Sequence, residues 1–284
     1  MHGDRTEDGI GDFLRSRRAR IRPEEVGLTS YGRRRVPGLR REEVAQLAGV
    51  SVDYYIRLEQ GRGPSVSDAV LDSIARVLRL DETEHAYLRT VARPRRRPGR
   101  RPPAARVRPG IQRLLDGMDR TPAFVLGPRM DVLAWNALAD AVSGYSRLAP
   151  ADRSVPRHVF LDPRARALYP QWHAVAAQTV AQLRLNAGHH PEDGELRALV
   201  GELSTRSEDF CRLWADHEVK VCRYGVKRIA HPVAGPLTLP FETLTVPAEP
   251  EHTLVVYLPE PGSETAERLR LLAGWKTPAT ATVG

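Results

Sequence analysis

A stretch rich in arginine and proline divides the chain into two parts. The segment from Arg93 to Gly110 holds eight Arg, five Pro and two Gly and has no acidic residue. Prolines remove backbone hydrogen-bond donors and like charges repel one another, so this segment predicts an extended linker. The chain has 284 residues, enough for about two domains of ordinary size. We therefore expect a first domain over residues 1–92, a linker over 93–109, a second domain over 110–275 and a flexible C-terminal tail over 276–284.

The two parts differ in charge. Residues 1–110 hold 24 Arg and 15 acidic residues, whereas residues 111–284 hold 19 Arg plus Lys and 20 acidic residues. The net charge of +8 is therefore +9 on the first part and −1 on the second. This asymmetry is expected when one domain binds a polyanion and the other does not. Arg outnumbers Lys 40 to 3, as in chains encoded by GC-rich genomes, so the position of each Arg must decide its role.

Two classes of protein are excluded by patterning. No run reaches the roughly 18 consecutive apolar residues of a membrane helix, and the first residues lack the apolar core of a signal peptide. We therefore expect a cytoplasmic protein with no membrane partner. Cys211 and Cys222 are too few for a disulfide scaffold or a four-cysteine zinc site, and we interpret both as ordinary thiols.

Apolar stripes of helical period run through the first part. They predict helices at 11–21, 39–48, 52–59, 67–78 and 81–92. Ser51, Ser67 and Asp81 stand at N-cap positions of the last three. The first domain is therefore predicted to be all-α, with about five helices.

The second part mixes helices and strands. Helices are predicted at 111–118 and 136–142, in a long region from Trp172 to Ala215, and at 264–272. Alternating or β-branched runs between Gly and Pro turns predict strands at 123–126, 131–135, 219–223, 227–231, 237–246 and 253–258. This order of elements predicts an α+β domain.

The segment from Leu39 to Arg62 carries the spacing of a helix-turn-helix. Ala45 is the small residue where two helices cross, Gly49 occupies a turn that needs positive φ, and Leu58 packs back from the second helix. Ser51 caps that second helix. The segment resembles the helix-turn-helix of phage-repressor type, the XRE class.

The resemblance implies further core positions, and at one position the sequence departs from the usual motif. Tyr55 stands where this motif usually has an aliphatic residue, so the pocket beneath the second helix is roomier or Tyr55 reaches its edge. Glu59 matches an acid that is normally structural in this class, and we leave it out of the site. The same core is expected to include Val44, Leu47 and Val50.

Matching the motif residue by residue gives the DNA-binding candidates. On the outward face of the second helix, Arg57 is suited to a bidentate contact with guanine, Asp53 to a cytosine amino group and Val52 to a thymine methyl. Ser51, at a helix N-terminus, can contact a phosphate, and Tyr54 is expected at the DNA backbone. The full set of predicted DNA-binding residues is Arg41, Ser51, Val52, Asp53, Tyr54 and Arg57.

Other basic residues lie beside the motif. The candidates for phosphate contacts are Arg33, Arg34, Arg35, Arg40 and Arg62. Spacing does not encode phosphate contacts, so a solvated basic loop stays open as an alternative. The linker likewise either lies in a neighbouring minor groove or is a solvated tether. An all-helical bundle with no DNA role is the remaining alternative for the whole first part.

A longer resemblance covers nearly the whole chain. The strings PGLRREEVAQLAGVS and YYIRLEQGRGPSVS are similar to the N-terminal domain of actinobacterial regulators of the MmyB type. Residues 110–274 resemble their ligand-binding domain through AFVLGPRMDVLAWNALADAV and HPVAGPLTLPFETLTVP. The resemblance implies a PAS-like fold for the second domain and a transcription regulator in which a small apolar ligand, of fatty-acid or secondary-metabolite type, modulates DNA binding. We expect a homodimer that presents two recognition helices to half-sites roughly 34 Å apart on double-stranded DNA.

The distribution of aromatic residues favours a cavity in the second domain. All four Trp and four of the five Phe lie beyond Gly110, and large rings can line an apolar pocket. Solid core is the alternative for each ring. The candidates for the ligand pocket are Trp135, Tyr145, Trp172, Phe210, Trp214, Phe241 and Tyr257.

No pattern of catalytic residues is found. The nine His include none with HExxH spacing, and the chain has no CxxC pair, glycine-rich phosphate loop or GxSxG elbow. We therefore expect no enzyme activity, no cofactor and no metal site. Two other functions stay open: an antitoxin or anti-regulator whose helix-turn-helix binds a protein partner, and an enzyme tethered to DNA.

Overall fold

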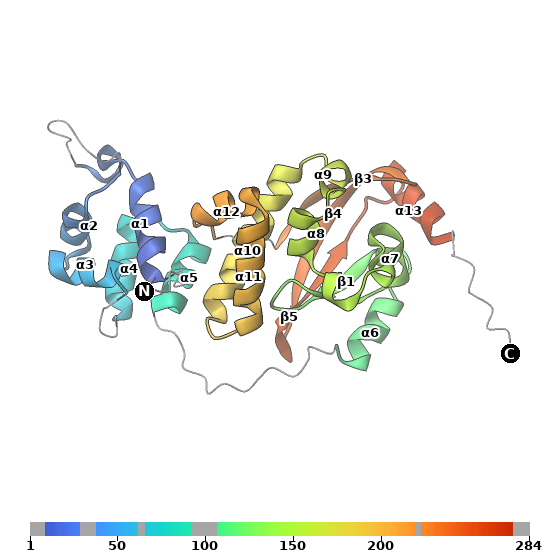
Figure 1. The fold of residues 1–284 in the computed structure, drawn as a ribbon, viewed down its shortest axis with the longest axis horizontal. Helices are drawn as coiled ribbons and strands as arrows, with labels where there is room; N and C mark the ends of the chain where they lie inside the picture. Colours follow the sequence, from blue (N-terminus) through green and yellow to red (C-terminus); the bar gives the residue numbers. More distant parts are fainter. Residues whose placement is uncertain (1–8, 29–37, 62–65, 93–106, 220–222, 275–284) are drawn as a thin grey trace.

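The protein is elongated, with a helical domain at one end and a mixed domain at the other (Figure 1). The computed structural model describes residues 9–28, 38–61, 66–92, 107–219 and 223–274. Helices over residues 10–92 are followed by a domain of helices and one five-stranded antiparallel sheet, which confirms the predicted fold class.

The first domain contains five α-helices and one short 3-10 helix among its described residues. Ser51 accepts a hydrogen bond from the Tyr54 N–H at 3.2 Å, and Ser67 caps the next helix in the same way. Asp81 and Glu84 form a reciprocal capping box, so all three predicted caps are confirmed. The elements are α1 (Ile10–Arg20), the 3-10 helix η1 (Pro23–Val26), α2 (Arg41–Ala48), α3 (Val52–Glu59), α4 (Asp68–Val77) and α5 (Glu82–Ala92).

One apolar core joins these helices. The prediction that Leu47 belongs to it is wrong, because Leu47 is 38% exposed while Ala45 and Ala48 fill the inward face of α2. Tyr55 is fully buried, so the pocket beneath α3 is roomy enough to hold the whole ring. Residues buried almost completely in this core include Phe13, Leu14, Leu39, Val44, Ala45, Leu58, Leu71, Ile74 and Leu88.

The second domain begins with a helix and alternates helices with strands. The prediction of a strand at 219–223 is wrong for Val219 and Arg223, which lie outside the strands; residues 220–222 lie outside the described residues. The helices are α6 (Pro109–Asp116), α7 (Ala137–Ser143), α8 (Val155–Leu161), α9 (Ala165–Leu168), α10 (Trp172–His189), α11 (Gly194–Arg206), α12 (Glu208–Ala215) and α13 (Glu264–Gly274). The strands are β1 (Ala123–Leu126), β2 (Val132–Trp135), β3 (Tyr224–His231), β4 (Gly235–Val246) and β5 (Glu249–Tyr257).

The sheet has the strand order β2-β1-β5-β4-β3 and is antiparallel throughout. Side chains alternate between its faces, as the period of a strand requires. One face presents Phe124, Phe241 and Tyr257 to α7 and α13. The other face presents Val125 and Val256 to α6.

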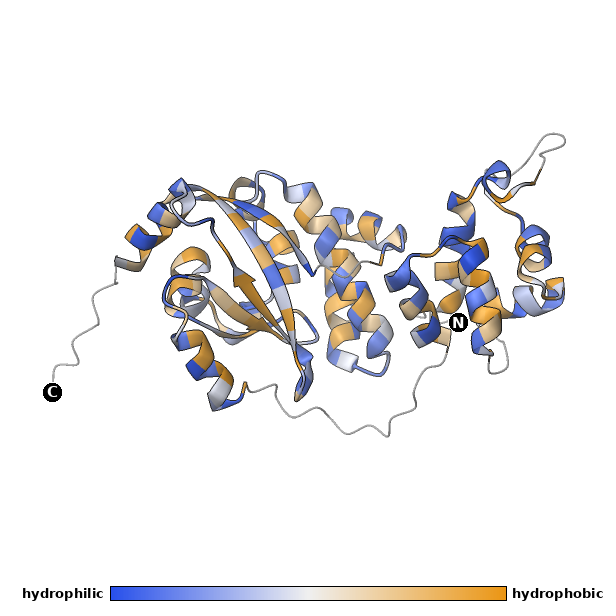
Figure 2. Ribbon diagram, turned by 180° about the vertical axis from the view of Figure 1, so that it is seen from behind, coloured by the Kyte–Doolittle hydropathy of each residue, from blue (hydrophilic) through white to orange (hydrophobic). Residues whose placement is uncertain are grey.

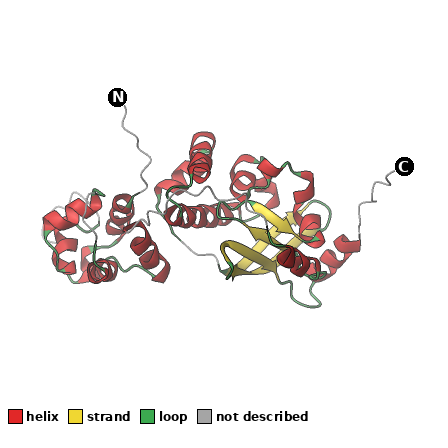
Figure 3. Cartoon of the chain, turned by 90° about the horizontal axis from the view of Figure 1, so that it is seen from below, coloured by secondary structure: helices red, strands yellow, loops and turns green. Residues whose placement is uncertain are grey.

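Helices α10 to α12 lie between the first domain and the sheet (Figure 1), and the view from below likewise shows helices between the all-helical end and the strands (Figure 3). Apolar residues run along these helices (Figure 2). Val180, Leu183 and Phe210 are buried among them, while Leu185 of α10 packs into the core of the first domain. The two domains therefore meet directly. None of the described helices is long and apolar enough to cross a membrane.

Buried His231 makes the stability of the second domain depend on pH. Its Nδ1 accepts hydrogen bonds from the backbone N–H groups of Val233 and Ala234, at 3.3 and 2.9 Å, and burial lowers its pKa. Between this lowered pKa and about pH 6.5, His231 takes up a proton mainly in the unfolded chain, so the free energy of unfolding falls on acidification by up to about 1.4 kcal/mol per pH unit.

Urea unfolding of the wild type and His231→Asn at about pH 7.5 and about pH 5.5 tests this prediction. The Asn oxygen can accept the same N–H groups without titrating, so His231→Asn is expected to lose less stability than the wild type on acidification. Equal losses in the two proteins would show that His231 does not contribute.

Candidate DNA interface and ligand-binding domain

The outward face of α3 is exposed to solvent. The turn before it is made by Gly49 in the left-handed conformation, with φ of 71°. Ser51, Val52, Asp53 and Arg57 are all exposed on α3 and its N-cap. Arg57 Nε lies 3.4 Å from the Asp53 carbonyl oxygen, one turn earlier. The structure therefore brings four of the predicted DNA-binding residues together on one surface.

The two tyrosines of α3 are placed differently from these residues. Tyr54 is partly buried and packs against the edge of the first-domain core. Tyr55 points inward, and burial raises its pKa. Only Tyr54 thus stays near the predicted DNA surface.

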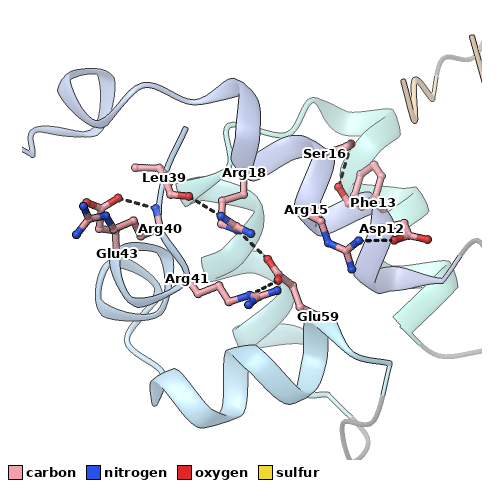
Figure 4. A network of polar contacts seen from close by, with 10 residues as sticks. All are labelled: Asp12, Phe13, Arg15, Ser16, Arg18, Leu39, Arg40, Arg41, Glu43 and Glu59. Atoms are coloured by element: carbon pink, nitrogen blue, oxygen red, sulfur yellow. Dashed lines mark hydrogen bonds and ion pairs between the residues drawn. The ribbon is translucent and has the colours of Figure 1, made fainter. Parts of the chain in front are cut away.

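A buried carboxylate at the end of α3 binds two arginines (Figure 4). Glu59 Oε1 lies 2.8 Å from Arg18 Nε of α1, and Oε2 lies 2.6 Å from Arg41 Nε of α2. Arg18 also donates to the Leu39 carbonyl oxygen at 2.7 Å. A buried charge is tolerated only when it is paired in this way, so Glu59 ties α3 to both neighbouring helices.

This contact gives Arg41 a partner inside the protein. Its hydrogen bond to Glu59 raises its pKa, and 44% of its side chain remains exposed. Local spacing carries no signal for this pairing, because Arg41 and Glu59 are 18 positions apart. The guanidinium group keeps an exposed side beside α3.

Most of the phosphate candidates fall outside the described residues. These are Arg33, Arg34, Arg35 and Arg62. Arg40 is exposed at the N-cap of α2, where its backbone N–H donates to Glu43 Oε2 at 2.6 Å. Arg40 thus lies at the start of the helix that precedes the recognition helix.

The seven aromatic pocket candidates lie in two separate groups. Trp135, Tyr145, Phe241 and Tyr257 pack at or around one face of the sheet. They surround Phe124, whose ring centre lies 5.6 Å from Tyr145 and 5.8 Å from Tyr257; sequence reasoning did not single out this residue. The other candidates, Trp172, Phe210 and Trp214, belong to α10 and α12.

A cavity of about 220 Å³ opens between α8, α10 and α12. Trp172 is the single predicted pocket residue among the residues that line it. Arg166 stacks over the Trp172 ring at 3.9 Å and pairs with Asp209 of α12. The lining residues are Val159, Phe160, Leu161, Asp162, Pro163, Arg166, Trp172 and Asp209. The cavity is therefore open to solvent and combines apolar side chains with the charged groups of Asp162, Arg166 and Asp209.

Among the described residues, no cluster of three or more His, Cys, Asp or Glu side chains is arranged to hold a metal ion.

A helix-turn-helix with an exposed second helix, packed against an α+β domain that contains a cavity, defines a DNA-binding protein with a sensor domain. Residues 10–88 match a helix-turn-helix domain family. Residues 107–272, more than half of the chain, match the family described as MmyB-like transcription regulator ligand binding domain, and the chain belongs to this family. No curated protein matches the chain. Both families are regulatory, and together they make the protein a ligand-responsive DNA-binding transcription regulator.

Removing the charge of Glu59 is expected to destabilise the first domain. Glu59→Gln leaves Arg18 and Arg41 facing a neutral amide, which for a broken buried ion pair costs about 3 kcal/mol. Urea unfolding of the full chain measures this loss. Glu42→Gln, at an exposed position of α2, is the matched control and is expected to unfold like the wild type. A loss for Glu59→Gln as small as that of the control would show that the buried pairs do not hold the helices together.

Proposed function

We propose that the protein reads a DNA major groove with the outward face of α3 and that a small apolar ligand in the second domain modulates this binding. The observation that carries the proposal is the exposed row of Ser51, Val52, Asp53 and Arg57 on a helix whose other face is buried. These side chains include a donor pair for guanine, an acceptor for cytosine and an apolar group for the thymine methyl.

Residues around α3 supply the other contacts of this proposal. Leu47 is exposed on α2 and adds an apolar group close to the start of α3. Arg40 and Arg41 at the start of α2 bind phosphates, with Arg33, Arg34, Arg35, Arg62 and the Tyr54 hydroxyl as further backbone contacts. The linker over 93–109 acts as a solvated tether between the domains proposed over 1–92 and 110–275. A cytoplasmic homodimer would place two α3 helices in successive major grooves roughly 34 Å apart.

The cavity beside α12 is the proposed ligand site. Val159, Phe160 and Trp172 can contact an apolar chain, and Arg166 suits a carboxylate that would compete with Asp209 for its guanidinium group. The cavity volume of about 220 Å³ lies below the roughly 300–1,000 Å³ typical of ligand pockets, so it fits a short-chain ligand or the head of a longer one. The proposal assigns no catalytic step and no cofactor to the second domain.

Replacing Arg57 tests the DNA-reading face. Arg57→Ala is expected to weaken binding to a duplex selected by the full chain by about 1–3 kcal/mol and to relax its preference at one base pair. Arg76→Ala, which removes an equal charge from an exposed position of α4, is the matched control. Fluorescence anisotropy with the selected duplex and with single-base variants measures both effects.

Two results of that titration would contradict the proposal. Equal affinity and equal preference in Arg57→Ala and Arg76→Ala would remove α3 from base reading. Weak binding that does not distinguish the selected duplex from random DNA would instead favour a protein partner for the helix-turn-helix, as in an antitoxin.

Native mass spectrometry tests the ligand site. We expect the purified full chain to carry an added mass that organic extraction removes, and the extracted protein to bind octanoate as a short apolar carboxylate. Leu161→Trp fills the cavity, so this variant is expected to carry no added mass and to bind no octanoate. Leu271→Trp, at an exposed position of α13, is the control and is expected to behave like the wild type. Retention of the ligand by Leu161→Trp would place the site elsewhere.

A further inference from the structure

Helix α12 ends against the first domain, where carbonyl groups of its last turn and of the two residues that follow it accept hydrogen bonds from arginines of both domains. Arg20 and Arg17 of α1 donate to the Asp216 and His217 carbonyl oxygens, each at 2.8 Å. Arg184 of α10 donates to the Trp214 carbonyl oxygen. The C-terminal end of a helix carries a partial negative charge, so three guanidinium groups gathered at this end stabilise it.

Two of these arginines are buried in the contact. The Arg17 side chain is 3% exposed, and its Nε lies 2.9 Å from Glu84 Oε1 of α5. Arg184 is 1% exposed, stacks over the Trp214 ring at 4.0 Å, and places Nη1 3.1 Å from His217 Nδ1. Buried guanidinium groups are costly unless their partners stay in place, so the two domains hold a specific relative position.

Apolar packing seals the same contact. Leu185 of α10 and Val219 belong to the core of the first domain. Gly188 of α10 lies so close to Tyr87 of α5 that a Cβ there would stand 2.3 Å from the ring carbon Cε2. Any side chain at position 188 must therefore displace the buried Tyr87 ring or push α10 and α5 apart.

The contact between α12 and α1 lies between the cavity of the second domain and helix α3 of the first. On one side, Asp209 of α12 lines the cavity, and the Phe210 ring of α12 lies 5.1 Å from the ring of Phe160, a lining residue from α8, so α12 packs directly against the cavity wall. On the other side, Arg18 of α1 binds Glu59 of α3. Gly11 packs against the Glu59 backbone, where a Cβ would stand 2.0 Å from the carbonyl oxygen.

We propose that α12 and α1 form the contact that couples the ligand cavity to the recognition helix, an inference that rests on the proposed function of both sites. A ligand that displaces α12 changes how Arg17 and Arg20 hold α1, and α1 passes the change to α3 through Arg18. Helix α3 lies on the side of the first domain away from the second domain, with α1, α4 and α5 between them (Figure 1). Within one chain, the second domain therefore acts on α3 through α1 and does not cover it.

Coupling is reciprocal, so DNA can serve as the probe in place of the unidentified ligand. Gly188→Ala drives a wedge between α10 and Tyr87. Gly201→Ala in α11 is the matched control, because nothing lies within 4 Å of its added Cβ. Alanine favours a helix over glycine, so neither substitution weakens its own helix.

Hydrogen–deuterium exchange of the full chain, with and without a duplex selected from a random library, tests the coupling. In the wild type and Gly201→Ala, duplex binding is expected to change amide exchange in α12 by about fivefold or more, the low end of typical coupling. In Gly188→Ala we expect the duplex to bind still, but to leave amide exchange in α12 unchanged. Arg20→Ala removes the hydrogen bond to the Asp216 carbonyl oxygen without adding a side chain between the domains. It is expected to reduce the effect of the duplex on amide exchange in α12, whereas Arg15→Ala, its control, is expected to leave that effect unchanged.

Each remaining outcome is decisive. Duplex binding that leaves exchange in α12 unchanged in the wild type, or that changes it equally in Gly188→Ala, overturns the inference. If no duplex binds, the proposed DNA reading fails. Amide exchange in α1 is then compared with and without octanoate. Octanoate binding without a change at α1 in the wild type again overturns the coupling.

Discussion

A single buried carboxylate, that of Glu59, fixes the position of the recognition helix. It binds Arg18 of α1 and Arg41 of α2, so neither neighbouring helix can move away from α3 without breaking one of the two ion pairs of this buried carboxylate. The proposed base-reading face of α3 is therefore held by the orientation of α1 as well as by the helix-turn-helix itself. Because α1 also caps α12 through Arg17 and Arg20, one helix carries both the internal order of the first domain and its contact with the second.

The helix-turn-helix could be predicted because its signals are local. Gly49 is required by a left-handed turn, and Ser51 caps the helix that follows, each within a few residues of the element that it controls. Strand alternation likewise placed most of the sheet. The misplaced Leu47 shows the limit of such signals: on a helix of eight residues, the direction of one side chain depends on the crossing with a neighbour, which the local pattern does not contain.

The contacts between the domains could not be predicted in this way. Helical period places Arg17 on the apolar stripe of α1, four positions after Phe13 and four before Ile21, but Arg17 and His217 are 200 positions apart and no local signal pairs them. The aromatic candidates divided into two groups for a related reason. Composition places rings in the second domain, but only the packing of α10 and α12 separates Trp172 and Phe210 from the rings near the sheet. Long-range packing, and not local propensity, determines which residues line the cavity.

The central claim is that the ligand state of the second domain sets the DNA affinity of the first. The most direct test measures the dissociation constant of the full chain for its selected duplex before and after organic extraction, at one fixed salt concentration. The account predicts that the two values differ by about fivefold or more, as for a typical coupling between sites. Equal dissociation constants for the loaded and the extracted protein would contradict it.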